Sequence, residues 1–264
     1  MQQTKDIHNN FSKHEAFLDD IIINYDNKGD DYGNQKRNSL KLFKLNGKTL
    51  NVKSFRIPNV INQIAYRFFR KSKAQRSFEY AKQLQSLNVG TPQPIAYYEL
   101  KTLFLFKKSY YISEHLECDL TYRELIHDFN YPDYDTILRA FTRFTFNLHE
   151  KGIKFLDHSP GNTLIKKTEN GYDFFLVDLN RMEFKQLDFE ERMKNFARLS
   201  KYREMVEIMS DEYAKSYNKP YKEVFDLMWK EVQVFRNKHE GKQRLKRRLK
   251  LSQNHYSHLK TQVL

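Results

Sequence analysis

Three polar residues of types that can do chemistry stand close together in residues 155–182, FLDHSPGNTLIKKTENGYDFFLVDLNRM: they are Asp157, Asn162 and Asp178. Asp157 lies in a Ser-Pro-Gly loop, and Asp178 closes the apolar run 174–177. Lone carboxylates are costly to bury at strand ends. One carboxylate can accept a proton from a hydroxyl group, and another can bind Mg²⁺ together with an amide oxygen. The three residues are therefore the leading candidates for a catalytic site.

The elements expected to position them begin with a small β-rich region. Residues 39–45, SLKLFKL, and 49–55, TLNVKSF, flank Asn46-Gly47, which is a strong hairpin signal. Lys53 lies on the second of these strands, on the face opposite Leu50. Further strands are predicted at Ile21–Ile23, at 94–100 and at 109–116, and a helix over residues 60–89.

After Leu116 the pattern becomes helical. Ile137, Phe141, Phe144 and Leu148 recur at helical spacing, and Gly152 follows the end of that helix. Amphipathic helices are also predicted within 188–201 and 221–238, and a strand pair at TLIKK and DFFLVDL. We therefore predict a β-rich N-terminal lobe over residues 1–116 and a mostly helical C-terminal lobe over residues 117–264.

The amino-acid composition indicates which classes of binding partner and which cellular location to expect. The chain of 264 residues carries a formal net charge of +13, which favours an anionic partner such as a nucleotide, a nucleic acid or a phosphorylated membrane surface, or else a basic solvated surface. Its single cysteine, Cys118, cannot form an internal disulfide. No apolar run resembles a signal peptide or a membrane span. We therefore expect a cytoplasmic protein.

The motifs NVKSF, GIKFLDHSPGN and FFLVDLNRM resemble the strand lysine, catalytic loop and metal-binding aspartate of the protein-kinase-like superfamily, in that order. The set RKSKAQRS, GTPQPIAYYE, SYYIS, HSPGN and VDLNRM is similar to the lipopolysaccharide kinase family, which phosphorylates Kdo or heptose sugars of the inner core. The likeness covers roughly residues 20–210. It implies an α+β, bilobal protein-kinase-like fold with one helix in the small lobe, and an ATP- and Mg²⁺-dependent phosphotransferase.

The same resemblance assigns roles to single residues. Lys53 would pair with the α- and β-phosphates of ATP, and Glu79 would orient its ammonium group. Asp157 would accept the proton of the acceptor hydroxyl, because Asp157 and Asn162 have the D-x4-N spacing of a kinase catalytic loop. Asn162 and Asp178 would hold Mg²⁺.

Parts of the chain depart from the general kinase pattern. The sequence DLN replaces Asp-Phe-Gly at Asp178, which suggests that no activation segment flips, and Phe155 stands where many kinases carry a histidine. The loop with Gly29 and Gly33 lacks the G-x-G-x-x-G spacing, so whether it covers the phosphates is open. For His149 and His158 we expect a structural or substrate-orienting role rather than metal binding.

Alternative functions are a RIO-like or other atypical protein kinase, a small-molecule kinase of the aminoglycoside-phosphotransferase type, and a non-catalytic binding module. The joint presence of the candidate residues argues against the last. The absence of a docking motif like Ala-Pro-Glu argues against a peptide substrate, and no nucleic-acid reader module is recognisable. The expected partner is a lipid A-core saccharide or related sugar, and nucleic acid is not expected.

Two basic segments could bring the protein to a membrane surface. Arg70, Lys73 and Arg76 form either a solvated helix face or a contact for an anionic sugar or lipid phosphate. Residues 236–251 hold eight Lys or Arg and a single Glu, and as a helix they would surround Leu245 and Leu249 with positive charge. Peripheral binding at the inner face of the cytoplasmic membrane is one interpretation; a solvated tail or an RNA-binding tail are the others. The oligomeric state stays open.

Overall fold

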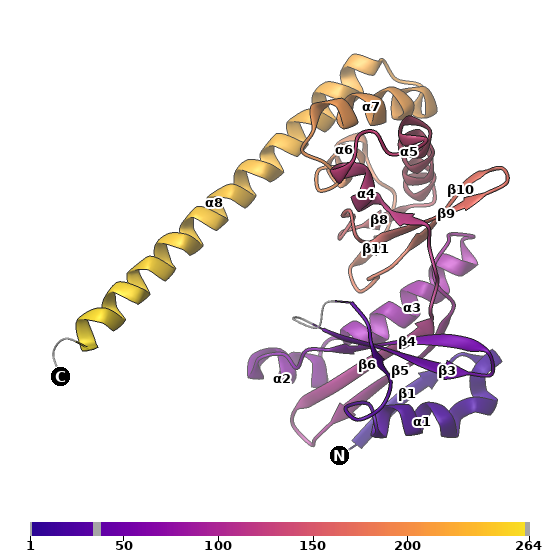
Figure 1. Cartoon of the computed structure of the whole chain (residues 1–264), viewed down its shortest axis with the longest axis vertical. Coiled ribbons are helices and arrows are strands. Elements are labelled where there is room, and N and C mark those ends of the chain that lie inside the picture. The colour runs from indigo at the N-terminus through magenta and orange to yellow at the C-terminus, as the bar shows by residue number, and fades with distance from the viewer. Residues whose placement is uncertain (1, 34–37, 262–264) are drawn as a thin grey trace. The chain divides into compact units, whose positions relative to one another are not determined.

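The computed structural model describes residues 2–33 and 38–261 (Figure 1). Its contacts divide the chain into two compact units. The first unit comprises residues up to 124 together with 155–157 and 161–184, and the second comprises 125–154, 158–160 and the residues from 185 onward. The predicted lobe boundary after Leu116 stays a prediction.

The first unit is built on an antiparallel six-stranded sheet with strand order β1-β5-β6-β4-β3-β2. Its strands are β1 (Gln2–Ile7), β2 (Asp30–Asp31), β3 (Ser39–Leu45), β4 (Lys48–Phe55), β5 (Pro94–Lys101) and β6 (Phe106–Glu114). The β3–β4 hairpin turns at Asn46 and Gly47, which both have positive φ, as the sequence predicted.

Helices cover both faces of this sheet because side chains alternate along its strands. Helix α1 (Glu15–Ile23) packs with Leu50 and Val52 of β4 in one core cluster. Helix α3 (Lys73–Ser86) packs its Phe78 against Phe55 in a second cluster. Lys53 has the same parity along β4 as Phe55, so it projects from the α3 face. The predicted division between Leu50 and Lys53 is confirmed.

Two predictions about this unit were wrong. Ile21–Ile23 ends helix α1 instead of forming a strand, because Leu18, Ile21 and Ile22 recur at helical spacing on the buried side. The single helix predicted over 60–89 is two helices, α2 (Val60–Phe68) and α3. They are separated because Ser72 caps the second, its hydroxyl accepting a hydrogen bond from the backbone N–H of Gln75 at 3.1 Å.

Smaller elements complete this part of the chain. A three-stranded sheet has the order β10-β9-β7. The remaining short elements are the 3-10 helix η1 (Asn9–His14), β7 (Leu120–Thr121), β8 (Ile153–Phe155), β9 (Thr163–Thr168), β10 (Gly171–Leu176) and β11 (Met182–Phe184).

The second unit is helical. Its helices are α4 (Tyr122–His127), whose first turn belongs to the first unit, α5 (Tyr134–Glu150), α6 (Phe189–Asn195), α7 (Arg203–Tyr217) and α8 (Tyr221–Thr261). Buried Ile137, Phe141 and Leu148 confirm the amphipathic pattern predicted for α5. Helix α8 is long but polar, and no helix in the described part of the chain is long and apolar enough to span a bilayer.

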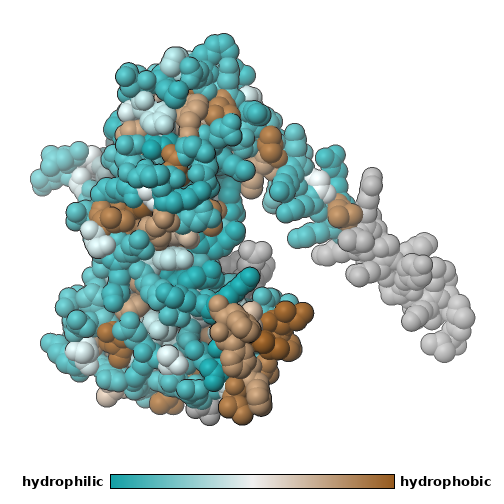
Figure 2. Space-filling model, turned by 180° about the vertical axis from the view of Figure 1, so that it is seen from behind, coloured by the Kyte–Doolittle hydropathy of each residue, from teal (hydrophilic) through white to brown (hydrophobic). Residues whose placement is uncertain are grey.

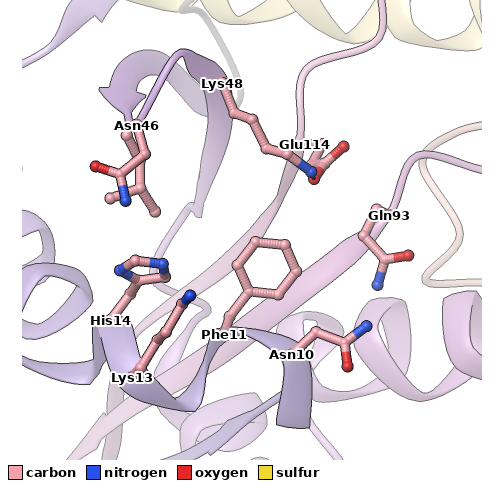
Figure 3. A pocket seen from close by; sticks show the side chains of 9 residues that line it. Asn10, Phe11, Lys13, His14, Asn46, Lys48, Gln93 and Glu114 are labelled. Carbon is pink, nitrogen blue, oxygen red and sulfur yellow. Dashed lines mark hydrogen bonds and ion pairs between the residues drawn. The ribbon is translucent and has the colours of Figure 1, made fainter.

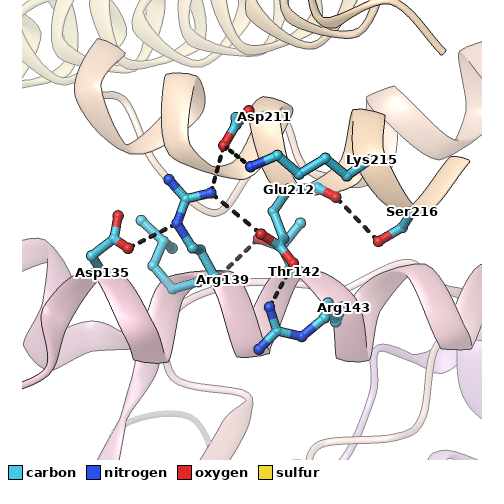
Figure 4. Close-up of polar contacts among 9 residues, drawn as sticks. Asp135, Arg139, Thr142, Arg143, Asp211, Glu212, Lys215 and Ser216 are labelled. Carbon is cyan, nitrogen blue, oxygen red and sulfur yellow. Dashed lines mark hydrogen bonds and ion pairs between the residues drawn. The ribbon is translucent and has the colours of Figure 1, made fainter. Parts of the chain in front are cut away.

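Ion pairs fix α5 against α7 (Figure 4). Nη1 of Arg139 donates to Asp211 at 2.6 Å and to Glu212 at 3.3 Å, while its Nε donates to Asp135 at 2.8 Å. Arg143 reaches the other oxygen of Glu212 at 2.5 Å. A carboxylate shared by two guanidinium groups holds the helices in register more firmly than one exposed pair would. This fold, a β-rich N-terminal part with helices mostly in the C-terminal part, confirms the predicted α+β class.

Candidate active site

Lys53 and Asp178 form the centre of the candidate site. The ammonium Nζ of Lys53 lies 2.5 Å from Oδ1 of Asp178, and the two side chains are 16% and 36% exposed. Lys53 comes from the middle of a sheet, where it is paired in register with Tyr111 on β6 and Leu40 on β3. The sheet thus fixes a positive charge beside a carboxylate that follows β10.

The backbone at Asp178 has an unusual conformation. Its φ is +59°, in the left-handed region that few non-glycine residues adopt, although Asp tolerates it better than most. Asn180 supports it by donating from Nδ2 to Asp178 Oδ1 at 2.9 Å. Such a conformation costs about 1–3 kcal/mol and persists only where the surroundings enforce it. The sharp turn directs the Asp178 carboxylate toward Lys53 at the end of the strand.

The end of β10 is anchored by residues that sequence reasoning did not single out. The backbone N–H of Leu176 donates to Gly90 O at 2.9 Å, and the Thr91 hydroxyl donates to Leu176 O at 2.9 Å. A Cβ on Gly90 would lie 2.3 Å from the carbonyl oxygen of Phe174, so only glycine fits there. The only sequence signal was the Gly-Thr pair within GTPQPIAYYE.

Hydrogen bonds also tie the predicted catalytic loop to this strand. Asn162 donates from Nδ2 to the carbonyl oxygen of Asp157 at 2.8 Å, and its own carbonyl accepts from the N–H of Val177 at 3.0 Å. Arg181 Nη1 donates to Asp157 Oδ1 at 3.0 Å. Asp157 and Asn162 are thereby bonded to each other, and Asn162 to Val177, the residue before Asp178.

Two arginines at the site were not predicted. Arg181 follows Asp178 by three positions and pairs with Asp157, a contact for which the sequence gave no signal beyond VDLNRM. Arg123 lies against the catalytic loop, where a Cβ on Gly161 would be 2.6 Å from its Nη2. Gly161 leaves room for this guanidinium group beside the loop backbone.

Glu79 is not brought to Lys53. Its carboxylate accepts from Lys71 Nζ at 3.0 and 2.8 Å and from Gln75 Nε2 at 3.0 Å, all within or just before α3. Among the contacts of the described residues, the carboxylate paired with Lys53 is Asp178. The expected Lys53–Glu79 ion pair is thus not formed in this structure, and a role for Glu79 stays a prediction.

The two histidines near the loop sit in the second unit and are buried. His149 bonds Tyr213 through Nδ1 at 2.9 Å and Asn195 through Nε2 at 3.1 Å, and burial lowers its pKa to about 4. His158 stacks on Phe141, and burial lowers its pKa to about 3. Both are neutral at neutral pH, which fits a structural role.

A separate pocket of about 410 Å³ lies in the first unit (Figure 3). Phe11 forms its apolar wall, and Lys48 and Glu114 meet as an ion pair at its side. None of the five predicted site residues lines it. We therefore assign the candidate site to the Lys53–Asp178 centre rather than to this pocket.

The described residues contain no cluster of three or more His, Cys, Asp or Glu that could hold a metal ion by themselves. Asp178 and Asn162 offer one carboxylate and one amide oxygen. Mg²⁺ is usually held in this way, by one or two carboxylates with phosphate and water oxygens completing the shell. The donor set therefore fits Mg²⁺ bound together with a phosphate substrate.

Comparison with known proteins identifies the family. No curated protein matches the chain. The solved structure of WaaP in complex with acyl carrier protein shares its fold with a TM-score of 0.62 and 16% identity, over 91% of this chain and 99% of that chain. The sequence pattern of the lipopolysaccharide kinase (Kdo/WaaP) family matches residues 37–219. Because that match covers well over half of the chain, this protein belongs to the lipopolysaccharide kinase (Kdo/WaaP) family and is a kinase of lipopolysaccharide core sugars.

Proposed function

We propose that this kinase transfers phosphate from ATP, with Mg²⁺, to a hydroxyl group of an inner-core Kdo or heptose. The observation that carries the proposal is the meeting of Lys53 and Asp178 at 2.5 Å. Phosphoryl transfer needs a fixed cation for the phosphates and a carboxylate for the metal in one place, because catalysis is mostly positioning and charge neutralisation. Family membership supports the acceptor class.

Asp157 is the proposed base. As the acceptor oxygen forms its bond to the γ-phosphorus, the bond from that phosphorus to the β,γ-bridging oxygen breaks and ADP leaves. The hydroxyl proton passes to the Asp157 carboxylate. Arg181, bonded to one oxygen of that carboxylate, and Asn162, bonded to its backbone carbonyl, restrict how Asp157 can turn. They act as positioning residues.

Lys53, Asp178 and Asn162 are the proposed binding groups for the nucleotide. Lys53 would contact the α- and β-phosphates, and Asp178 and Asn162 would hold Mg²⁺. The ion supplies neutralisation of charge on the phosphate oxygens. Lys53 and Asp178 are paired with each other. When nucleotide and metal bind, Lys53 would instead contact phosphate and Asp178 would hold the ion.

The proposed acceptor is a saccharide carried by a lipid, so we also propose that the protein works at an anionic membrane face in the cytoplasm. Cells with the gene, without it, and carrying the Asp157→Asn variant would be compared by intact-mass analysis of lipid A-core. We expect one phosphate fewer in the second and third samples. Equal masses in all three would contradict the proposed acceptor.

A further inference from the structure

Helix α2 exposes its apolar side chains and buries a polar one. Val60, Ile61, Ile64 and Phe68 follow one helical stripe and are 59%, 79%, 42% and 54% exposed, whereas Gln63 is buried. A helix that packs on a globular core shows the opposite arrangement, with its apolar stripe inward. Within the described part of the chain, the apolar face of α2 therefore has no protein core to cover it.

The turn between β5 and β6 extends this apolar face. Arg67 on α2 donates from Nε to the carbonyl oxygens of Thr102 and Leu103, at 3.1 and 3.3 Å, and so holds the turn beside the helix. Leu103 and Phe104 in the turn and Phe69 after the helix are all strongly exposed. Seen from behind, a broad hydrophobic patch is visible on this part of the surface (Figure 2). We call these exposed apolar residues of α2, Phe69 and the 102–105 turn the α2 surface.

The charges around the α2 surface are mostly basic. Residues 56–78 contain six basic residues and no acidic one, and Glu79, which follows them, is paired with Lys71. Arg70 and Lys73, next to the apolar stripe, are exposed. Apolar and aromatic side chains flanked by an excess of Lys and Arg are the composition that binds the interface of an anionic bilayer.

We propose that the α2 surface is a docking site for an anionic lipid bilayer. This inference rests on the proposed function, since a kinase of a lipid-borne sugar must reach its acceptor at a membrane. A second copy of this chain is the less suitable occupant. A symmetric dimer through this surface would bring two sets of cations together, and like charges oppose association.

The test uses the full chain and vesicles of phosphatidylcholine with about 30% phosphatidylglycerol, an anionic content that attracts basic segments. Ile61→Ser/Phe69→Ser removes the two most exposed side chains of the α2 surface. Ile23→Ser is the matched control, because Ile23 is 78% exposed on another helix. We expect wild type and control to co-sediment with these vesicles. The vesicle partition coefficient of the double variant should be lower by at least about tenfold, because two inserted side chains are lost.

A second readout follows the surface itself. The variant Phe69→Trp should shift its fluorescence to shorter wavelength when the vesicles are added, and part of that shift should survive about 0.5 M NaCl, where charge attraction is screened beyond roughly 4 Å. No shift, or equal vesicle binding by wild type and the double variant, would overturn the proposal. So would a wild-type dimer in sedimentation velocity that the double variant dissociates.

Activity separates this inference from the proposed function. The double variant should phosphorylate a soluble, deacylated core sugar as fast as wild type, and lose rate only on vesicle-embedded acceptor. If wild type binds vesicles through the α2 surface but phosphorylates neither acceptor, the docking site stands and the proposed function fails.

Discussion

Lys53 and Asp178, 125 positions apart in sequence, form an ion pair of 2.5 Å between the middle of the large sheet and the turn after β10. The pairing needs both the sheet that carries Lys53 and the left-handed turn that directs Asp178. Because the pair is only partly exposed, solvent screens it less than a surface pair. The two groups that the proposed mechanism requires are thus held together by the fold.

Asp178→Asn should lower kcat for Mg²⁺-dependent transfer by roughly 10³-fold. The change removes the charge that we propose binds Mg²⁺, and this reduction corresponds to a loss of several kcal/mol in the transition state. Asp173→Asn, an exposed aspartate on the same strand, is the control and should keep wild-type turnover. Steady-state phosphate transfer at saturating ATP measures both, and undiminished turnover of Asp178→Asn would refute the assignment.

Gly90→Ala should displace β10 and with it the candidate site. The new Cβ would lie 2.3 Å from Phe174 O, so the strand that ends before Asp178 must move. We expect the free energy of unfolding to fall by about 1–3 kcal/mol. The value of kcat should fall as well. Gly241→Ala provides the comparison, since an added Cβ there meets no atom within 4 Å and favours the helix. Similar behaviour of the two variants would argue against the anchoring role.

Stability should fall as the pH is lowered from about 6.5 toward 4. The buried His149 and His158 have folded-state pKa values of about 4 and about 3, below the ordinary value of about 6.5 in an unfolded chain. In that window the unfolded chain binds more protons than the folded chain. The contribution of the two histidines to the free energy of unfolding is therefore fully present above pH 6.5 and decreases below it. Each histidine should contribute about 2 kcal/mol of loss between pH 6.5 and 5.

Urea denaturation at pH 7 and pH 5 measures this dependence. His149→Gln should flatten it, while His127→Gln, at an exposed position, should leave the slope unchanged. Equal slopes in wild type and His149→Gln would mean that His149 becomes protonated without unfolding the chain.

The basic end of α8 should add electrostatic binding to anionic vesicles. Among the side chains of this helix whose burial the structure describes, the last buried one is Val232, and positions 237–247 are all exposed. Residues 236–251, for which the sequence analysis considered a helix, are helical, although the side chain of Leu249 lies outside the described residues. Each basic residue near an anionic surface contributes about 1 kcal/mol.

Truncation after Phe235 should therefore weaken co-sedimentation at low salt and leave transfer to a soluble sugar intact. Raising the salt should remove the difference between the truncated and full-length chains. If the full-length protein ignores the vesicles but binds RNA tightly in the same buffer, the membrane interpretation fails and a RIO-like role gains support.

The sequence predicted the structure best where a residue pattern is compatible with one local backbone conformation only. The hairpin at Asn46-Gly47 and the period of α5 were predicted correctly, and the family resemblance is confirmed by the match over residues 37–219. Ile21–Ile23 was misread because three consecutive apolar residues suit a strand as well as a helix end. The contacts of Arg181 and Gly90 depend on chain segments brought together by tertiary structure, which local spacing does not encode.

The most direct test of the account is transfer of phosphate from labelled ATP to purified lipopolysaccharide core sugar by Asp157→Ala and wild type. We predict that wild type adds one phosphate in the presence of Mg²⁺. Asp157→Ala should add none detectable yet bind ATP, measured by calorimetry, within about a few-fold of wild type, because the proposed base would contact the acceptor hydroxyl and not the nucleotide. Transfer by Asp157→Ala at the wild-type rate, or loss of ATP binding while its circular-dichroism spectrum stays that of the folded protein, would contradict the assignment.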